Sequence, residues 1–451
     1  MEKTDLYYKK MTETPVSKLI ISLGIPTTVT MLITNIYNMA DTYFVGTLGE
    51  SPQAATGILF TLQSVIQAIA FMLGQGSGAM VSKALADKNT DEATEYSSTA
   101  FFTGAIAGTA LMVIGLIFLT PFMRLLGSTE TILPYAKQYG MWVLLSCPFM
   151  VCSLVLNNNL RYEGKAFYAM IGLTTGGIIN IFGDWLLIAV MDMGVFGAGL
   201  STAVSQFISF CILLYFYARM AQSNIDFKAI SRRAAVYADI VKVGFPALIR
   251  QGLSSISNGL LNNLTKPYGD SAIAAMSVVN RFSMFIMCVG LGIGQGFQPV
   301  ASFNYQAGKY KRVKKGMHFT MAAGALLVSC IVIPVFIFAE DIVYIFQKSD
   351  DVCRIGAFAL RCACGGLMFM PLSVPVNMLY QSIRKAGLSA FLSLMRSGVM
   401  FIPTLIITAN LFGLTGVQIS QPVADALTGL ISIPFILHFT FKHPDEKENS
   451  Q

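Results

Sequence analysis

The sequence predicts an all-α membrane protein with twelve transmembrane helices in two pseudo-symmetric six-helix lobes around a central cavity. The first observation is composition, because only 12% of the 451 residues are charged and 54% are hydrophobic. A soluble domain carries about 25% charged residues. The second observation is that the apolar residues fall in runs of roughly 20, enough to cross the hydrocarbon core of a bilayer. The third is an internal repeat. Because no strand-like alternation is present, helices rather than a barrel must satisfy the backbone hydrogen bonds.

The long apolar runs define the predicted spans. They lie at residues 17–41, 53–81, 97–121, 136–160, 167–190, 197–220, 240–264, 273–300, 317–339, 355–381, 389–410 and 415–439.

The polar segments between the spans define the expected domains. The polar start of the chain, 1–16, lacks the apolar core and cleavage site of a signal peptide, so we expect the first helix to be retained. The domains are listed in chain order: a cytoplasmic N-terminus at 1–16, an N-lobe at 17–220, a cytoplasmic linker at 221–239, a C-lobe at 240–439 and a cytoplasmic tail at 440–451.

The distribution of lysine and arginine predicts the orientation. The termini and the loops on their side hold 22 of the 31 basic residues, and the opposite loops hold five. Cytoplasmic loops carry the excess of Lys and Arg, so we expect both termini in the cytoplasm and the chain in the cell membrane, the inner or plasma membrane. This bias also explains the net charge of +7. The basic run 309–315 falls in one cytoplasmic loop, so no nucleic-acid partner is needed to explain it.

The repeat appears when the sequence is compared with itself at an offset of 220 residues. Between 23 and 82, thirteen of sixty aligned positions are identical, including Gly24-x-Pro26 with Gly244-x-Pro246 and Gly74-Gln75-Gly76 with Gly294-Gln295-Gly296. Each half contains six spans, so both halves have the same orientation and are related by an axis along the membrane normal. This plan is common in secondary transporters, although duplicated helices also occur in channels.

The acidic residues within the spans are the first candidates for function. Asp41, Asp184 and Asp425 lie there, and a charge at the bilayer centre costs at least roughly 2.5–3.5 kcal/mol. The repeat provides a control for Asp41, Asp184 and the nearby Asn180. Their counterparts in the second half carry no charge and are Leu261, Thr404 and Met400. The scaffold itself therefore does not require these groups in the first half.

Asn180 and Asp184 are four residues apart and share a helix face. Thr202 lies near the start of the next span. Together with Asp41 they form an oxygen-rich set that suits a hard cation such as Na⁺, or that could hold a proton. We therefore predict a cation-binding or coupling site at Asp41, Asn180, Asp184 and Thr202, with no cofactor other than a coupling H⁺ or Na⁺. Three histidines offer little to build a transition-metal cluster.

Other residues are expected to line a substrate cavity. The 24 methionines are flexible and polarizable, which suits surfaces that accept varied apolar ligands. The predicted lining residues are Tyr37, Asn157, Met276, Phe282, Met287 and Asn377. The roles of Asp425, Arg250 and Arg281 stay open. No Walker loop or nucleophile with a partner base is present, so we expect no enzyme.

Four motifs together resemble the multidrug and toxic compound extrusion (MATE) family over essentially the whole chain. They are Gly24-Ile25-Pro26, Asp41-Thr42-x-Phe44-Val45-Gly46, Gly74-Gln75-Gly76 and Gly194-Val195-x-Gly197-Ala198-Gly199. The presence of Asp41, Asn180, Asp184 and Thr202 is similar to the bacterial DinF- and MepA-like branch, in which these positions form a cation site in the amino-terminal lobe.

The resemblance implies secondary active multidrug efflux. A proton or sodium ion would move inward by antiport as a lipophilic, often cationic, drug moves out, with alternating access of the two lobes. We expect small-molecule drugs or organic cations and the lipid bilayer as partners, and a monomer. The alternative is a flippase for lipids or lipid-linked oligosaccharides of the same superfamily, which the four arginines within the spans keep open.

Overall fold

The computed structural model describes residues 2–346 and 349–442, so most of the tail predicted at 440–451 lies outside the described residues. Every regular element in the described part is a helix. The elements of the first half are α1 (Glu2–Glu13), α2 (Val16–Gly46), α3 (Glu50–Ala86), α4 (Thr90–Ile117), α5 (Leu119–Leu125), α6 (Leu133–Tyr162), α7 (Ala166–Asp184), the π-helix η1 (Trp185–Val190), α8 (Gly194–Met220) and the 3₁₀ turn η2 (Phe227–Ala229). Those of the second half are α9 (Ala234–Thr265), the 3₁₀ turn η3 (Lys266–Tyr268), α10 (Asp270–Gln306), α11 (Tyr310–Ile337), α12 (Ala339–Phe346), α13 (Asp350–Leu367), α14 (Met370–Ser382), α15 (Ala386–Leu394), the π-helix η4 (Met395–Val399), α16 (Phe401–Phe412) and α17 (Leu414–Lys442).

The helices confirm the all-α membrane fold. In the described part of the chain, ten helices are long and apolar enough to cross a membrane, and α13 with α14 makes an eleventh span if the bent pair is counted as one. These two helices meet at an angle of 48°. Pro371 stands in the first turn of α14 and cannot supply a backbone N–H, which accounts for the break. The predicted span 240–264 corresponds to α9, which has the length to span but is less apolar than the others.

The helices pack into two compact units. The first unit comprises Met1–Tyr8 and Val29–Gln251, and the second comprises Lys9–Thr28 and Gly252–Gln451. All three changes of unit fall inside a helix, α1, α2 or α9, rather than in the linker between α8 and α9. The lobe ranges 17–220 and 240–439 remain a prediction of domain organisation.

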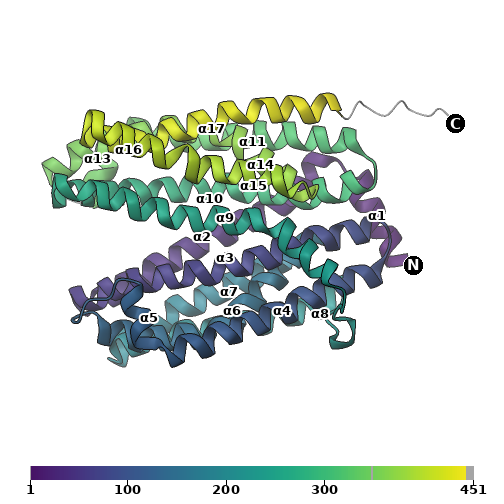
Figure 1. The fold of residues 1–451 in the computed structure, drawn as a ribbon, viewed down its shortest axis with the longest axis horizontal. Helices are drawn as coiled ribbons and strands as arrows, with labels where there is room; N and C mark the ends of the chain where they lie inside the picture. The colour runs from purple at the N-terminus through teal and green to yellow at the C-terminus, as the bar shows by residue number, and fades with distance from the viewer. Residues whose placement is uncertain (1, 347–348, 443–451) are drawn as a thin grey trace. The chain divides into compact units, whose positions relative to one another are not determined.

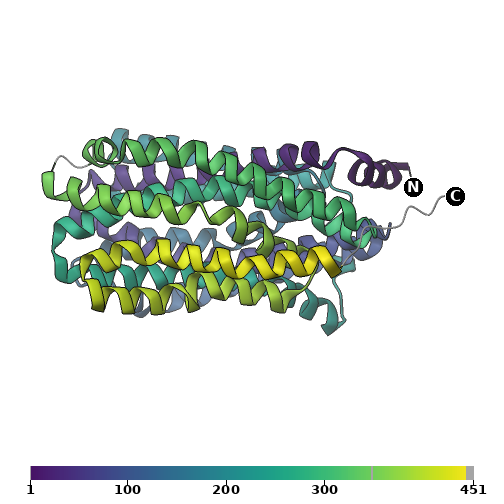
Figure 2. The same ribbon diagram turned by 90° about the horizontal axis from the view of Figure 1, so that it is seen from above.

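One element is central in each unit. In the first unit α6 packs against α3, α4, α7 and α8, and in the second the bent pair α13–α14 packs against α10, α11 and α17 (Figure 1). A second view shows α17 running beside its neighbours along the second unit (Figure 2). Because α6 and α13–α14 occupy equivalent places in the repeat, the two halves share one packing plan.

The repeated glycines lie where two helix backbones touch. In the first unit, a Cβ atom on Gly76 of α3 would lie 2.0 Å from the carbonyl oxygen of Ile240 in α9. A Cβ on Gly244 of α9 would lie 1.8 Å from the carbonyl oxygen of Met72 in α3. Only glycine allows this approach.

The second unit contains the equivalent contact. Here the helix with Gly-Gln-Gly comes from the second sequence half and the helix with Gly-x-Pro comes from the first. A Cβ on Gly296 of α10 would lie 2.4 Å from the backbone nitrogen of Gly24 in α2. The first part of α2 therefore packs on α10, and the first part of α9 packs on α3. This exchange explains why Gly-x-Pro and Gly-Gln-Gly recur in register in the sequence.

The linker that follows α8 is fixed to the first unit by a buried carboxylate. Glu163, just after α6, is fully buried. It accepts hydrogen bonds from the backbone N–H groups of Gln222 and Ser223, from the Ser223 hydroxyl and from Tyr217 Oη. Burial raises the pKa of Glu163 from its ordinary value of 4.5 to about 7, although these hydrogen bonds lower it.

The side chains of α4 hold the rest of the linker. Ser98 Oγ accepts from the backbone N–H of Asp226 at 3.0 Å, and Thr99 Oγ1 accepts from that of Ser231 at 3.0 Å. These bonds satisfy backbone groups of a segment that has little regular structure of its own.

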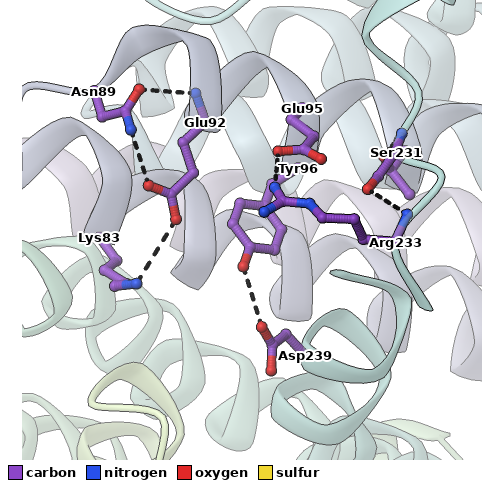
Figure 3. A network of polar contacts seen from close by, with 9 residues as sticks. Lys83, Asn89, Glu92, Glu95, Tyr96, Ser231, Arg233 and Asp239 are labelled. Atoms are coloured by element: carbon purple, nitrogen blue, oxygen red, sulfur yellow. Dashed lines mark hydrogen bonds and ion pairs between the residues drawn. The ribbon is translucent and has the colours of Figure 1, made fainter. Parts of the chain in front are cut away.

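An outer set of polar contacts completes the attachment (Figure 3). Figure 3 shows Arg233 pairing with Glu95, and the Tyr96 hydroxyl reaching Asp239 of α9 at 3.1 Å. The linker is therefore attached to the first unit along its length.

Candidate functional site

A chain of hydrogen bonds joins three of the four predicted cation-site residues. Tyr139 of α6 donates to Oδ2 of Asp41 at 2.8 Å, and its oxygen lies 3.1 Å from Thr202 Oγ1 of α8. Asn180 Nδ2 of α7 donates to Thr202 Oγ1 at 3.3 Å and to Ser201 Oγ at 3.4 Å. Side chains of α2, α6, α7 and α8 thus meet at one point inside the first unit.

These residues surround a small cavity. Asp41, Asn180 and Thr202 line it together with Tyr37, one of the residues predicted to line a substrate cavity. The remaining lining residues come from the same helices and from α3, and they are Asn38, Gln63, Tyr139, Val143, Ser146, Met150 and Gln206. The cavity is therefore mainly polar on the side of α2, α7 and α8.

Glycines of α7 allow this close assembly. A Cβ on Gly183 would lie 2.5 Å from Ser201 Oγ, and a Cβ on Gly177 would lie 3.0 Å from the ring of Tyr37. These small residues therefore allow α7 to pack against both α8 and α2. At its end, Asp184 directly precedes the π-helix η1. Such π-helical turns frequently occur at functional sites.

Asp184 lies next to this cavity but does not line it. Its side chain is fully buried, and the charges of Asp184 and Asp41 act on each other. Both carboxylate oxygens of Asp184 lack a hydrogen-bond donor among the described residues, and so do Oδ1 of Asp41 and Oδ1 of Asn180. Four buried acceptor oxygens without donors carry a large desolvation cost.

The chemistry of this set fits a proton or an alkali cation. Carboxylate, amide and hydroxyl oxygens are hard ligands, and two carboxylates close together favour either a bound cation or a shared proton. Within the described residues, no group of three His, Cys, Asp or Glu side chains could hold a metal ion.

The second unit has no equivalent acidic site at the matching positions. Leu261, the counterpart of Asp41, is buried in the apolar core of that unit, and Met400, the counterpart of Asn180, packs against the same core. The two halves therefore share a scaffold and differ in the chemistry of their interiors.

Two of the predicted cavity residues connect neighbouring helices. Asn157 Nδ2 donates to the carbonyl of Ala169 at 3.0 Å, and Asn377 Nδ2 donates to the carbonyl of Ser389 at 2.9 Å. These bonds are equivalent under the repeat, since they join α6 to α7 and α14 to α15. A polar residue common to both halves is thus explained by helix packing.

The other predicted cavity residues lie in the core of the second unit. Met276 is buried there, and Phe282 and Met287 are partly buried against it. Their proposed contact with substrate stays a prediction.

Sequence reasoning missed Tyr139, which connects Asp41 to Thr202. The repeat contained a signal for it, because the counterpart of Tyr139 at an offset of 220 is Ala359. Gln206, whose counterpart in the second half is Asp425, also lines this cavity and is not among the predicted site residues. Comparing the halves position by position over all spans would have found both.

Comparisons with known proteins agree with this architecture. The family model MatE matches residues 26–186 and again residues 246–407. The two matches begin 220 residues apart, which is the offset of the internal repeat.

Relatives and solved structures of similar length resemble the whole chain. The multidrug export protein MepA of Staphylococcus aureus (strain MSSA476) is 26% identical over 437 residues, which cover 96% of each chain. MepA of Staphylococcus saprophyticus is 25% identical over 435 residues, also with 96% coverage of each.

Two solved structures superpose over almost the full length. One is an outward-facing conformation of a multidrug resistance MATE family transporter of the MOP superfamily, with a TM-score of 0.90, 23% identity and coverage of 96% of this chain and 97% of that one. The other is a MOP superfamily transporter from Pyrococcus furiosus, described as having a binding pocket of reverse polarity, with a TM-score of 0.89, 22% identity and coverage of 95% and 98%. Both structures have the same fold as this chain.

Proposed function

Because this chain belongs to the MATE family of membrane transporters, we propose that it exports lipophilic and cationic compounds in exchange for H⁺ or Na⁺. The exported class is suggested by the relatives described as multidrug export proteins. The coupling ion is suggested by the cavity of the first unit. Asp41, Asn180, Asp184 and Thr202 are the residues that would bind it.

One observation carries the ion-coupling part of this proposal. The acceptor oxygens of Asp41, Asp184 and Asn180 are buried without donors among the described residues. Such a set is stable only when a proton or cation is present, or when water can enter. A site that alternates between these two conditions is what an antiporter requires.

The mechanism follows from the contacts of Asp41. When the pair of acids is charged, Tyr139 donates to Asp41 and lies 3.1 Å from Thr202 Oγ1, so these two side chains link Asp41 to α8. Binding of a cation or proton removes the need for these donors and favours a tighter arrangement of α2, α7 and α8. A ligand shifts the conformational equilibrium by its differential affinity for the two states. In this proposal the ion therefore favours the state that releases substrate.

We also propose that transport proceeds by alternating access and that the functional unit is a monomer. The protein would lie in the cell membrane with both termini in the cytoplasm. The excess of basic residues on one side of the predicted spans supports the orientation.

The test is dye efflux from proteoliposomes with a pH gradient and a sodium gradient imposed separately. We expect one gradient to drive efflux in the wild type and neither to drive it in Asp41→Asn or Asp184→Asn. Efflux that keeps its full ion dependence in both variants would overturn the assignment of the site.

The flippase alternative receives less support from the structure than from the sequence. Of the four arginines within the predicted spans, Arg396 pairs with Asp425 and Arg361 pairs with Glu340. Arg250 donates to Gln75, so three of these cations have protein partners. Transport of a lipid-linked substrate instead of dye in the same vesicles would favour the flippase.

A further inference from the structure

The two halves carry opposite charges at one pair of equivalent helix ends. α4 and α11 both have 28 residues, and they begin and end 220 residues apart. The first two turns of α4 are acidic at three positions, Asp91, Glu92 and Glu95. The equivalent positions of α11 are all basic, and they are Lys311, Arg312 and Lys315. The repeat therefore keeps the helix and reverses the charge at its start.

Helix stability does not explain the basic start of α11. The N-terminus of a helix carries a partial positive charge, which favours acidic side chains, as in α4, and disfavours lysine. The general excess of basic residues on the side of the chain termini does not explain it either. The start of α4 lies on that same side of the predicted spans and is acidic. The positive charge is thus a property of the second half alone, and it suits an acidic partner.

In the first unit, the start of α4 binds the segment of chain that follows α8. Thr94 Oγ1 accepts a hydrogen bond from the backbone N–H of Asn224 at 3.1 Å, and Ser98 Oγ donates to the carbonyl of Asn224 at 3.2 Å. Glu95 pairs with Arg233 of the same segment (Figure 3). One face of α4 is therefore a docking surface for the linker.

The equivalent face of α11 is basic. Thr94, Glu95 and Ser98 correspond to Lys314, Lys315 and His318. Lys311 lies one turn before Lys315 on the same side of the helix. The side chains of Lys311, Lys315 and His318 are exposed. We call this surface the basic face of α11, and it consists of Lys311, Lys314, Lys315 and His318.

A different face of α11 packs against the rest of the second unit. Arg312 Nη2 donates to the carbonyl of Thr14 at 2.5 Å, and a Cβ atom on Gly316 would lie 3.1 Å from Cγ1 of Val16 in α2. Arg312 and Gly316 are four residues apart and share one side of the helix. The basic face is turned away from that side, so the packing of α2 leaves it accessible.

The last turn of α17 lies close to the start of α11. The ring centroids of Phe439 and Tyr305 are 6.5 Å apart, and those of Tyr305 and Tyr310 are 5.3 Å apart. Phe439 is in the last turn of α17, and Tyr310 is the first residue of α11. Residues 443–451, which follow α17 and lie outside the described part of the chain, are therefore attached within reach of the basic face.

This following segment has the charge and the spacing that the basic face requires. It contains three acids and one lysine, namely Asp445, Glu446, Glu448 and Lys447. Glu446 is four residues beyond the end of α17, just as Asn224, which contacts α4, is four residues beyond the end of α8. Four extended residues span at most about 14 Å. Both halves thus place a segment of complementary charge at the same distance after an equivalent helix.

We propose that residues 443–448 dock on the basic face of α11, as the linker docks on α4. The acids of this segment would pair with the lysines of that face. In the first unit the helix supplies the acid and the segment supplies the arginine, whereas in the second unit these charges are exchanged. A phospholipid headgroup has the charge to neutralise the same lysines, but the segment is tethered beside them and so has a high effective concentration.

The test introduces the photo-crosslinking residue p-benzoylphenylalanine at Asn449 of the full-length protein, which leaves every charge in place. The protein is reconstituted in vesicles of phosphatidylcholine and phosphatidylglycerol and irradiated, and the crosslinked peptides are identified by mass spectrometry. We expect the crosslink within residues 311–318. A crosslink to lipid or to another part of the chain, or the absence of any crosslink, overturns the proposal.

Charge variants then test the ion pairs. The variant Lys311→Asp with Lys314→Thr and Lys315→Glu gives α11 the residues that α4 has, so it is compatible with a helix start. The crosslink yield falls about fivefold or more, because several exposed pairs with modest individual contributions act together.

Reversing the charge of the segment provides the reciprocal variant. Asp445→Lys with Glu446→Lys and Glu448→Lys lowers the yield to a similar extent beside the native α11. These positions follow the last helix, so this variant also covers the case in which the α11 variant does not fold. Combining the two variants restores the crosslink to within about twofold of the wild-type yield. A combined variant that crosslinks no better than either parent overturns the pairing.

The matched control removes the same charge from exposed positions of the first unit. Lys228→Asp with Arg232→Thr and Lys242→Glu changes the net charge as much as the α11 variant does, and all three side chains are exposed. The crosslink yield should stay at the wild-type level. An equal fall in this control would assign the effect to net charge and overturn docking on α11.

Discussion

The hydroxyl of Tyr139 donates to Asp41 Oδ2 over 2.8 Å, while Oδ1 of the same carboxylate has no donor among the described residues. One half of the carboxylate is thus held in place by α6, and the other half is the part that would bind an ion in the proposed site. Tyr139 is almost fully buried, so water does not easily replace its hydroxyl.

Tyr139→Phe is expected to weaken ion coupling without preventing folding. The change removes one hydrogen bond to a charged group, which is worth about 1.5–3 kcal/mol. We expect the ion concentration needed for half-maximal dye efflux to shift by about tenfold, measured in proteoliposomes at varied pH and sodium concentration.

Tyr380→Phe provides the control for this change. Tyr380 is equally buried and donates to the carbonyl of Phe435 at 2.9 Å, far from Asp41 in the sequence and in the second unit. Its loss should lower stability with no change in ion dependence. A similar shift in ion dependence for both variants would contradict a specific role for Tyr139.

Gly76→Ala is expected to destabilise the protein by about 2 kcal/mol or more, because overpacking a tight contact costs roughly 1–3 kcal/mol. The new Cβ would lie 2.0 Å from the Ile240 carbonyl oxygen, so α3 and α9 must separate. Gly57→Ala in the same helix meets nothing within 4 Å and should be neutral or stabilising. Thermal denaturation in detergent distinguishes them, and equal melting temperatures would show that the backbone contact is not tight.

The sequence alone predicted the fold class because hydrophobic length and charge asymmetry are properties that the bilayer imposes on every span. The register of the repeat also identified the glycines at the α3–α9 and α2–α10 contacts. The repeat could not show that each contact joins a helix of one sequence half to a helix of the other half. That depends on where the first parts of α2 and α9 pack in the folded chain.

The candidate site was predicted only in part, because that prediction also depended on comparing the two halves of the sequence. Asp41, Asn180 and Thr202 differ in charge or polarity from the second half, or lie near residues that do, and the structure brings them to one cavity. Asn157 is polar in both halves, and it bridges helices. Differences between the halves thus indicated the polar cavity, whereas shared polar residues indicated packing.

The stability of the protein is expected to fall as pH rises from about 4.5 to about 7 because of Glu163. Burial raises its pKa to about 7 in the folded chain, from an ordinary value of 4.5. Between these values the folded state binds more protons than the unfolded state, so the contribution of Glu163 to stability is largest below about pH 4.5 and is lost by about pH 7. The contribution of this group is about 3 kcal/mol over that window.

Glu163→Gln should remove this decline, measured as the melting temperature of the solubilised protein from pH 5 to 8. Glu130→Gln is the control, because Glu130 is exposed and pairs with Arg124 at the surface. A pH slope that persists in Glu163→Gln would assign the effect to another group.

Thr99→Val is expected to expose the linker to protease while the helices stay intact. The backbone N–H of buried Ser231 donates to Thr99 Oγ1 at 3.0 Å, and valine has the same shape without the acceptor. An unpaired buried N–H costs about 1–3 kcal/mol, so trypsin cleavage after Arg232 should be faster by about tenfold. Thr109→Val, at an exposed position of the same helix, should leave the cleavage rate unchanged. If Thr99→Val is cleaved no faster than the wild type, then the Glu163 contacts and the polar contacts of Figure 3 are sufficient to hold the linker.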